Sequence, residues 1–322
     1  MNDSVLKKVI LIVAAIAVVA GAAAAVVGLL NGVGSGEAAG TSWGAAGTAV
    51  TGNRFDVDQR KSLPLDRVQR IEIEVVSSDV TVTESADGSV NARLHGTVSS
   101  NRSIAEPRLV AETSGGTASI RVDHRSVSVV MGWYRSDLKL EVAIPKGYRG
   151  ALVVHGVSAD FALPPGRTFT EVEATSVSGD ITLGAFTADA FRSRTVSGDL
   201  EAPSASAKSA DLGSTSGAME VGGLTGDLSA RTVSGDLRLG WSAFSGSIDI
   251  STTSGDVELG IPAGSGFRLD AGSTSGRITS DHAVTVRGSA SGPGRHSLTG
   301  EVGTGAGSVR VRTVSGGIRI GM

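Results

Sequence analysis

A short motif, Ser or Thr followed by any residue and then Ser-Gly, recurs along the second half of this chain at nearly constant spacing. In the seven copies that keep this spacing, the last residue, called the marker glycine, is Gly179, Gly198, Gly217, Gly235, Gly255, Gly276 or Gly316. Successive markers are 19, 19, 18, 20, 21 and 40 residues apart, so the last gap corresponds to two units with one degenerate member between them. Ala159 and Ser78 hold the same place in two weaker, earlier copies. A fixed period of this length predicts a stack of similar supersecondary units.

Side-chain character alternates on both sides of each marker. Residues seven and five before it are mostly apolar: Val172/Ala174, Phe191/Ser193, Ala210/Leu212, Leu228/Ala230, Ile248/Ile250, Leu269/Ala271 and Val309/Val311. Residues two and four after it are likewise mostly apolar: Ile181/Leu183, Leu200/Ala202, Met219/Val221, Leu237/Leu239, Val257/Leu259, Ile278/Ser280 and Ile318/Ile320. The residues between them are mostly polar. This alternation indicates two short strands per unit, each with one buried face.

One such unit cannot bury its apolar face alone, whereas stacked units can. We therefore predict an all-β protein whose residues 151–322 form a right-handed parallel β-solenoid with about 19–20 residues per coil. An antiparallel meander is the alternative, because the same motif can close a hairpin. The segment 86–147 departs from the period, and residues 65–150 are predicted to form an irregular N-terminal β subdomain that caps the first coil.

The N-terminus predicts where the protein works. Residues 9–30 are free of charged and strongly polar side chains, and as a helix they would span about 33 Å, enough for a hydrocarbon core of roughly 30 Å. Lys7 and Lys8 precede this segment and favour a cytoplasmic position for residues 1–8. We predict a single transmembrane helix at 9–30, a flexible Gly/Ala-rich linker at 31–64, and an extracytoplasmic C-terminal domain at the cell membrane. A cleaved signal peptide is the alternative.

Composition restricts the chemistry. The chain has no cysteine, which excludes disulfides, thiolate catalysis and cysteine zinc sites. Its formal net charge of −3 gives no reason to expect a nucleic-acid partner. The dipeptide Gly-Lys is absent, so the sequence contains no Walker A phosphate loop, and no cofactor is predicted.

The Ser-Gly-Asp sequence at the markers has two interpretations. In the first, the glycine takes a backbone conformation with positive φ, and the serine and aspartate accept hydrogen bonds within the turn. In the second, the repeated aspartates form a calcium ladder: Asp160, Asp180, Asp199, Asp236 and Asp256. We predict the structural role, because three of the markers are followed by Ala, Arg or Gly instead of Asp.

No catalytic group stands out. G-x-S-x-G occurs only at residues 40–44, inside the predicted flexible linker and not at a turn between a strand and a helix. The histidines show no metal-binding spacing: His95, His124, His155, His282 and His296. Asp281, His282 and Arg287 are close in sequence and form the one weak catalytic candidate. An outward basic stripe is predicted from three arginines that occupy the same position of the repeat: Arg194, Arg231 and Arg312. This stripe is either a binding surface for an anionic polymer or lipid headgroups, or simply a solvated face.

The chain resembles the bacterial putative-adhesin family of β-strand-repeat domains of unknown function, which is related to the Lia-type cell-envelope proteins. The resemblance lies in "RIEIEVVSSDVTV" (70–82), "LKLEVAIPKGYRGALVVHGVSADFAL" (138–163) and the repeated "TVSGDL" turns. It covers roughly residues 65–322 and implies a β-helical extracytoplasmic domain, but no catalytic or binding residues.

These observations together predict a membrane-anchored module that presents surface, either adhesin-like or a scaffold of the cell envelope, without catalysis. Its expected partners are the membrane and a cell-envelope polymer, a lipid or a membrane protein. One alternative is a sensor accessory that binds peptide, lipid or wall polymer, and another is a carbohydrate-active β-helix enzyme.

Overall fold

A computed structural model describes residues 53–101, 104–124, 134–286 and 296–322 of the chain. The described residues contain β-strands and no α-helix. Accordingly, no helix among them has the length and apolar character needed to cross a membrane. The predicted cytoplasmic segment 1–8 and transmembrane segment 9–30 lie outside the described residues.

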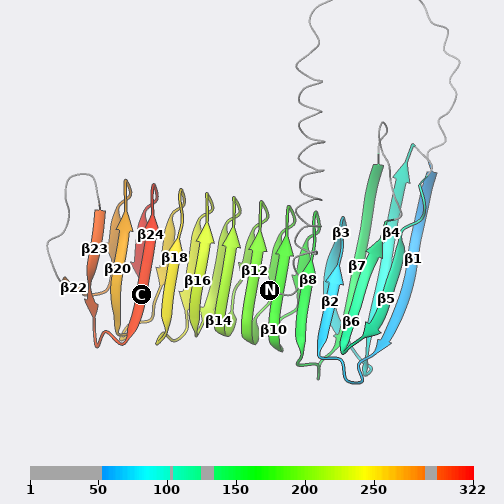
Figure 1. Ribbon diagram of the computed structural model, residues 1–322, viewed down its shortest axis with the longest axis horizontal. Helices are drawn as coiled ribbons and strands as arrows, with labels where there is room; N and C mark the ends of the chain where they lie inside the picture. The colour runs from blue at the N-terminus through cyan, green and yellow to red at the C-terminus, as the bar shows by residue number, and fades with distance from the viewer. Residues whose placement is uncertain (1–52, 102–103, 125–133, 287–295) are drawn as a thin grey trace, which may run out of the picture. The chain divides into compact units, whose positions relative to one another are not determined.

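The strands form two sheets, which we call sheet A and sheet B (Figure 1). In spatial order, sheet A contains β1 (Asn53–Pro64), β4 (Ser89–Ser100), β7 (Tyr134–Pro145), β3 (Ser78–Ser85), β9 (Phe161–Leu163), β11 (Ile181–Leu183), β13 (Leu200–Ala202), β15 (Met219–Leu224), β17 (Leu237–Trp241), β19 (Val257–Gly260), β25 (Ile318–Gly321) and β21 (Ile278–Ser280). Sheet B contains β22 (Thr285–Val286), β23 (His296–Val302), β20 (Phe267–Ser273), β24 (Gly307–Thr313), β18 (Ser247–Ser251), β16 (Asp227–Thr232), β14 (Ala205–Ser214), β12 (Phe186–Thr195), β10 (Arg167–Ser176), β8 (Ala151–His155), β2 (Arg70–Glu74), β6 (Thr117–Asp123) and β5 (Arg108–Ser114).

Each regular coil gives one strand to each sheet, and the marker motif joins the two strands. Neighbouring coils pair in parallel with the predicted register, so that Val172 lies beside Phe191 and Phe191 beside Ala210. The apolar positions around the markers face the space between the sheets and form one continuous core. The parallel pairing confirms solenoid-like stacking and excludes the antiparallel meander for these coils. The hand of the solenoid stays a prediction.

The N-terminal end contains a further coil and an antiparallel cap. Strands β2 and β3 form a coil that pairs in parallel with β8 and β9 on one side and with β6 and β7 on the other. Strands β4 and β1 then extend sheet A, and β5 extends sheet B, all by antiparallel pairing. The cap was expected, but its parallel members β6 and β7 were not.

Strand β1 corrects the predicted linker at 31–64, because residues 53–64 are a strand that pairs along its whole length with β4. Val57 is buried in the core, and Phe55 and Leu63 pack against that core. The linker was predicted from the Gly/Ala-rich composition, which the sequence shows only as far as about residue 53.

The C-terminal coils do not stack in chain order. The last coil, β24 and β25, lies between the coil of β18 and β19 and the coil of β20 and β21. The predicted degenerate coil between Gly276 and Gly316 is therefore wrong. That stretch instead includes β23, which runs antiparallel along the outer edge of β20, with β22 paired to it. The chain thus reaches the end of the stack and returns to fill a place inside it (Figure 1).

Candidate functional site

The repeated motif forms a ladder along one rim of the stack. In five of the coils, the marker glycine donates its backbone N–H to the Ser or Thr hydroxyl three residues earlier, at 2.7–3.1 Å: Ser176, Thr195, Ser214, Thr232 and Ser273. These hydroxyl-bearing residues are buried. The inward Ser or Thr therefore satisfies the turn, whereas the serine directly before the glycine lies exposed on the rim.

The marker glycines are required for close approach between coils, not for positive φ. None of the seven has a φ in the left-handed region, which contradicts the predicted conformation. A Cβ on any of them would lie less than 3.0 Å from a carbonyl oxygen of the neighbouring coil. In each case this oxygen belongs to the residue at the marker position of that coil. Gly198 meets Gly179 in this way, Gly217 meets Gly198, and Gly235 meets Gly217. Only a residue without a side chain allows the turns to stack this closely.

The repeated aspartates are occupied by main-chain hydrogen bonds. The Asp180 N–H donates to Asp160 Oδ1 at 2.9 Å, and the Asp199 N–H donates to Asp180 Oδ1 at 2.9 Å. The pattern continues through Ala218, Asp256 and Gly317, whose N–H groups each bond the aspartate of a neighbouring coil. Among the described residues, no group of three or more acidic or histidine side chains is arranged to hold a metal ion. The aspartate thus joins one turn to the next.

The predicted arginine stripe lies on the outer face of sheet B, but its members do not act alike. Arg194 reaches across Gly213 and pairs with Asp211 at 2.7 Å. Arg312 likewise crosses Gly272 and pairs with Asp270 at 2.5 Å. In both cases a glycine on the neighbouring coil leaves room for the guanidinium.

Arg231 differs from the other two stripe arginines. Arg231 lies between Ser251 and Gly213, but the Arg194 guanidinium already occupies the space over Gly213. The Arg231 guanidinium instead donates to the Ser229 hydroxyl at 3.1 Å. The structure shows no carboxylate partner for Arg231 among the described residues. Other coils separate the three arginines, so they do not form a continuous basic stripe.

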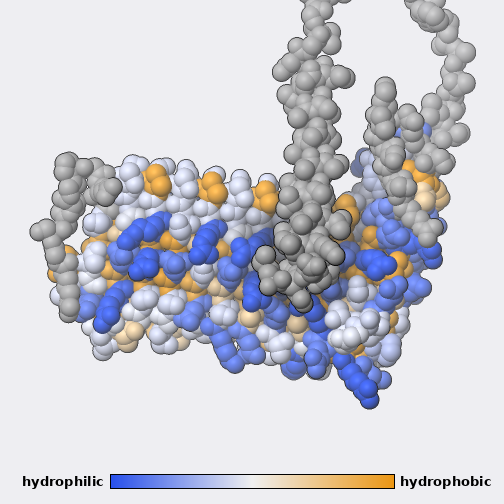
Figure 2. Space-filling model, in the orientation of Figure 1, coloured by the Kyte–Doolittle hydropathy of each residue, from blue (hydrophilic) through white to orange (hydrophobic). Residues whose placement is uncertain are grey.

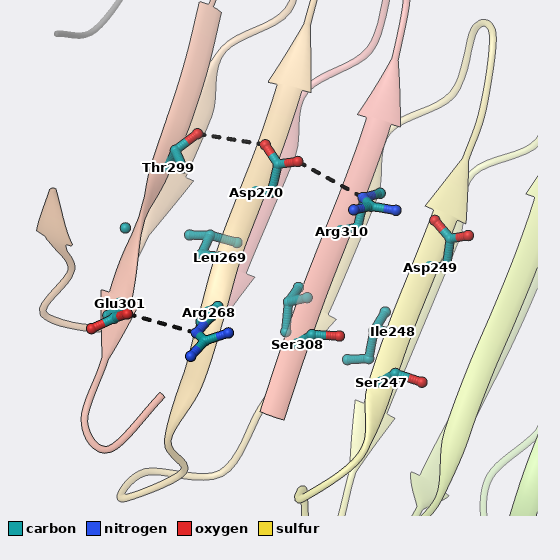
Figure 3. Close-up of a pocket in the computed structure, with 12 residues that line it drawn as sticks. Ser247, Ile248, Asp249, Arg268, Leu269, Asp270, Thr299, Glu301, Ser308 and Arg310 are labelled. Carbon is teal, nitrogen blue, oxygen red and sulfur yellow. Dashed lines mark hydrogen bonds and ion pairs between the residues drawn. The ribbon is translucent and has the colours of Figure 1, made fainter. Parts of the chain in front are cut away.

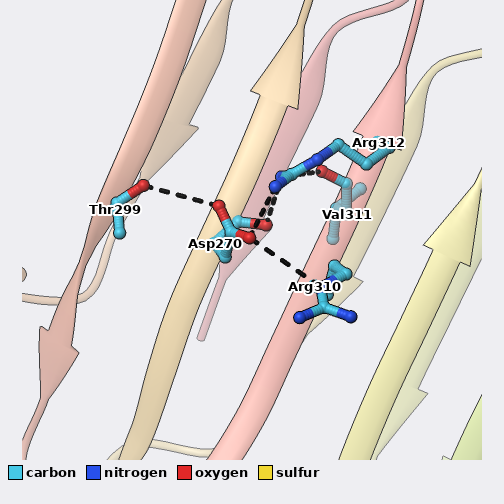
Figure 4. A network of polar contacts seen from close by, with 5 residues as sticks. All are labelled: Asp270, Thr299, Arg310, Val311 and Arg312. Carbon is cyan, nitrogen blue, oxygen red and sulfur yellow. Dashed lines mark hydrogen bonds and ion pairs between the residues drawn. The ribbon is translucent and has the colours of Figure 1, made fainter.

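A shallow groove of about 700 Å³ lies on the outer face of sheet B at the C-terminal end of the stack. Ser247 and Ser308 keep it open, and charged side chains surround it (Figure 3). Arg268 pairs with Glu301 at 3.7 Å and Arg310 with Asp270 at 3.8 Å. Figure 4 shows that Asp270 also accepts hydrogen bonds from the Arg312 guanidinium and the Thr299 hydroxyl. The groove thus carries both signs of charge, mostly paired between strands.

Sheet A carries a similar row of paired charges. Arg238 lies 3.9 Å from Glu258, and Arg319 lies 3.9 Å from the same carboxylate on its other side. Arg319 also pairs with Asp281 at 3.5 Å. Both outer faces therefore present mixed charge tied by ion pairs between neighbouring coils. Surface pairs of this kind contribute little stability individually, but they set the character of the surface.

The weak catalytic candidate does not assemble. Asp281 pairs with Arg319, while the buried His282 places Nε2 3.2 Å from the Gly321 carbonyl oxygen and stacks edge-on against Phe267. Arg287 lies outside the described residues. His282 therefore packs at the end of the core, where an aromatic row of Trp241, Phe244 and Phe267 leads to it.

Exposed valines form a row that sequence reasoning missed. Four of the exposed large hydrophobic residues occupy the position two before the marker: Val76, Val196, Val233 and Val314. Figure 2 shows hydrophobic side chains spaced along this rim between residues of intermediate hydropathy. The signal was present in the sequence, because Val or Thr occupies this position in every coil.

A glutamine clasp at the N-terminal end was also missed. Gln59 of β1 in sheet A donates its Nε2 to the Pro107 carbonyl oxygen at 2.8 Å and accepts the Leu109 N–H on Oε1 at 2.8 Å. These bonds join the edges of the two sheets. A glutamine in an otherwise charged segment gives no sequence signal for such a contact.

Comparison with known proteins places the chain in a family. No curated protein matches it. Solved structures that it resembles include a protein described as a putative adhesin from Bacteroides fragilis, 13% identical over 82% of this chain and 96% of that one, with a TM-score of 0.47. Another, described as a putative lipid binding protein from Parabacteroides distasonis, is 13% identical over 82% and 96% of the two chains, with a TM-score of 0.38. The family model described as Toastrack DUF4097 matches residues 68–321, from just before β2 to the end of β25, and the chain belongs to that family.

Proposed function

We propose that this protein is an adhesin-like interaction module of the bacterial cell envelope that acts by presenting its solenoid surface and not by catalysis. The observation that carries the proposal is the network of ion pairs on the two outer faces, where charged side chains of neighbouring coils pair over a broad, shallow surface. A surface of this kind suits contact with an extended partner better than enclosure of a small substrate.

The proposal includes a single-pass anchor at residues 9–30 and an extracytoplasmic solenoid. Its support is the uncharged apolar run in the sequence, with Lys7 and Lys8 before it. Salt washing and detergent extraction of the membrane fraction test this part. We expect the full-length protein to resist the salt wash, whereas recovery of a soluble form that begins near Ala23 would show that the segment is cleaved.

The partner class is an envelope polymer, a lipid or a membrane protein, and Arg231 is the stripe residue best suited to meet an anionic group. Among the described residues its guanidinium pairs with no carboxylate, whereas Arg194 and Arg312 each pair with an aspartate. The direct test uses full-length protein in liposomes, mixed with purified wall polymer or with vesicles containing anionic lipid.

We expect binding to one of these materials to weaken in the Arg231→Gln variant and to remain in the Arg194→Gln variant. Equal binding by protein-free liposomes would count against the interaction module. Hydrolysis or elimination products released from wall polysaccharide by the pure protein would instead support the carbohydrate-active alternative.

A further inference from the structure

The place that the last coil occupies is a slot with two pairing edges. Val309 of β24 lies beside Ile248 of β18 and also beside Leu269 of β20. In sheet A, Ile318 of β25 lies between Val257 and Ile278. Without this coil, the coils on both sides would each lose a row of main-chain hydrogen bonds, and unpaired strand edges readily accept another strand.

The slot is shaped for this coil. A Cβ on Gly316 would lie less than 3.0 Å from the Gly255 oxygen, and one on Gly276 would meet the Gly316 oxygen at similarly short range. Gly307, at the start of β24, leaves the space that the Phe244 ring occupies, since a Cβ there would lie 2.8 Å from that ring. Several independent contacts therefore specify which coil fits between these neighbours.

The connection that delivers the coil is short and conformationally restricted. Strands β23 and β24 flank β20 on opposite sides, and residues 303–306 cross from one to the other. Gly303 and Gly305 both have positive φ, of 57° and 66°. The crossing presses against the start of β20, because a Cβ on Gly266 would lie 2.8 Å from the Thr304 nitrogen. A short, tightly bent connection of this type is the kind that favours strand exchange.

We propose that the slot is an exchange interface between two copies of this chain, in which β24 and β25 of each copy fill the slot of the other. Inside the slot, a coil from a second copy makes the same hydrogen bonds and the same glycine contacts as the chain's own coil. The balance between the two forms therefore depends on the conformation of residues 303–306 and on protein concentration. The reciprocal form closes as a symmetric dimer, and this inference does not depend on the proposed function.

The first test uses the absence of native cysteine. Ser254 and Ser315 are exposed and stand directly before the stacked marker glycines Gly255 and Gly316. Two full-length single variants, Ser254→Cys and Ser315→Cys, are mixed in detergent, unfolded and refolded together, and then oxidised. A disulfide between the two variants forms only when the coil of one copy lies in the slot of the other.

The control pair is Ser197→Cys with Ser216→Cys, which occupy equivalent positions in mid-stack coils that follow each other in the chain. We expect the disulfide yield between the Ser254→Cys and Ser315→Cys copies to exceed the yield of the control pair at least tenfold. Equal yields for the two pairs would overturn the proposal.

The second test changes the hinge without changing the slot. A Cβ on Gly305 has no neighbour closer than 3.6 Å, so Gly305→Ala acts through its positive φ alone. Because the reciprocal dimer relieves one hinge in each of its two chains, we expect this variant to raise the dimer association constant at least about thirtyfold, measured by light scattering in detergent. The control is Gly166→Ala, which has a φ of 80° and open space around its Cβ but lies far from the slot. A Gly305→Ala variant with the wild-type association constant, or an equal rise in Gly166→Ala, would contradict exchange at this hinge.

Discussion

Replacing the marker glycine Gly235 by alanine tests the reason for the repeat. Its φ lies outside the left-handed region, so alanine can adopt the backbone conformation. The added Cβ, however, would lie less than 3.0 Å from the Gly217 oxygen of the neighbouring coil. Ordinary contact between carbon and oxygen requires that oxygen to withdraw by more than about 1 Å. Gly235→Ala therefore acts through the spacing between two coils.

The size of the effect follows from what this spacing holds in place. The Ser234 N–H donates to the Thr215 carbonyl oxygen at 2.9 Å, and the Gly235 N–H donates to Thr232 Oγ1 at 3.1 Å. Overpacking of a well-packed region costs about 1–3 kcal/mol, and each weakened hydrogen bond adds up to about 1 kcal/mol. We expect the free energy of unfolding to fall by about 2–4 kcal/mol, which corresponds to a fall in Tm of about 5–15 °C.

Gly147→Ala is the matched control, because Gly147 also lies in a turn, has no positive φ, and has no atom within 4 Å of an added Cβ. Its free energy of unfolding should stay within about 1 kcal/mol of the wild type, with stabilisation the expected direction. Thermal unfolding followed by circular dichroism measures both variants in the same detergent buffer. A Tm for Gly235→Ala within about 2 °C of the wild type, on a scale of about 2–4 °C per kcal/mol, would refute close approach as the reason for the glycine.

Three further predictions concern individual side chains. Thr232→Val removes the buried acceptor of a marker N–H and should lower the free energy of unfolding by about 1–2 kcal/mol in a denaturant titration. Thr252→Val should be neutral in the same titration, because the Thr252 hydroxyl has no hydrogen-bond partner among the described residues. Gln59→Ala opens the clasp, so the Leu109 amide should exchange its hydrogen at least tenfold faster, and unchanged protection would contradict the clasp. Arg93 of β4 donates a hydrogen bond to Asp58 of β1, and this bond lowers the pKa of the Asp58 carboxyl. Asp58 therefore stabilises the fold above about pH 4, and this effect is lost as the pH falls through the lowered folded-state pKa. The Tm difference between Asp58→Asn and the wild type should therefore be present at about pH 6 and vanish in acid, and a difference independent of pH would contradict this pairing.

The sequence predicted the internal structure of each coil well. Alternation around the markers identified the buried residues, and their parallel register agrees with the predicted spacing, as the pairing of Leu228 with Ile248 shows. This success has a simple physical cause, because burial on one face of a strand imposes a period of two on the sequence.

The order of the coils could not be predicted in the same way. Every coil presents similar apolar faces and a similar marker turn, so the coil that contains Gly276 and the coil that contains Gly316 are interchangeable by pattern. Only long-range contacts, such as Gly307 beneath the ring of Phe244, specify which neighbour each coil takes.

The role of the marker glycine could not be read from the motif either. A glycine with positive φ and a glycine in close contact with another turn look identical in sequence. The arginine stripe shows the same limit, because the glycines that accommodate Arg194 and Arg312 lie on neighbouring coils and not beside them in the chain. The sequence pattern singles out these residues but does not identify their partners.

Disulfide mapping of the coil order tests the interleaved stack most directly, because the glycine and aspartate ladders depend on which coil lies beside which. Ser254 lies beside Ser315 in the interleaved order, whereas stacking in chain order would place Ser254 beside Ser275. Oxidation of the full-length Ser254→Cys/Ser315→Cys variant should give a disulfide between the two cysteines in nearly every molecule. The Ser254→Cys/Ser275→Cys variant should give almost none, since these residues are two coils apart at about 4.8 Å per coil. Efficient linkage in the Ser254→Cys/Ser275→Cys variant, with none in the Ser254→Cys/Ser315→Cys variant, would contradict the fold described above.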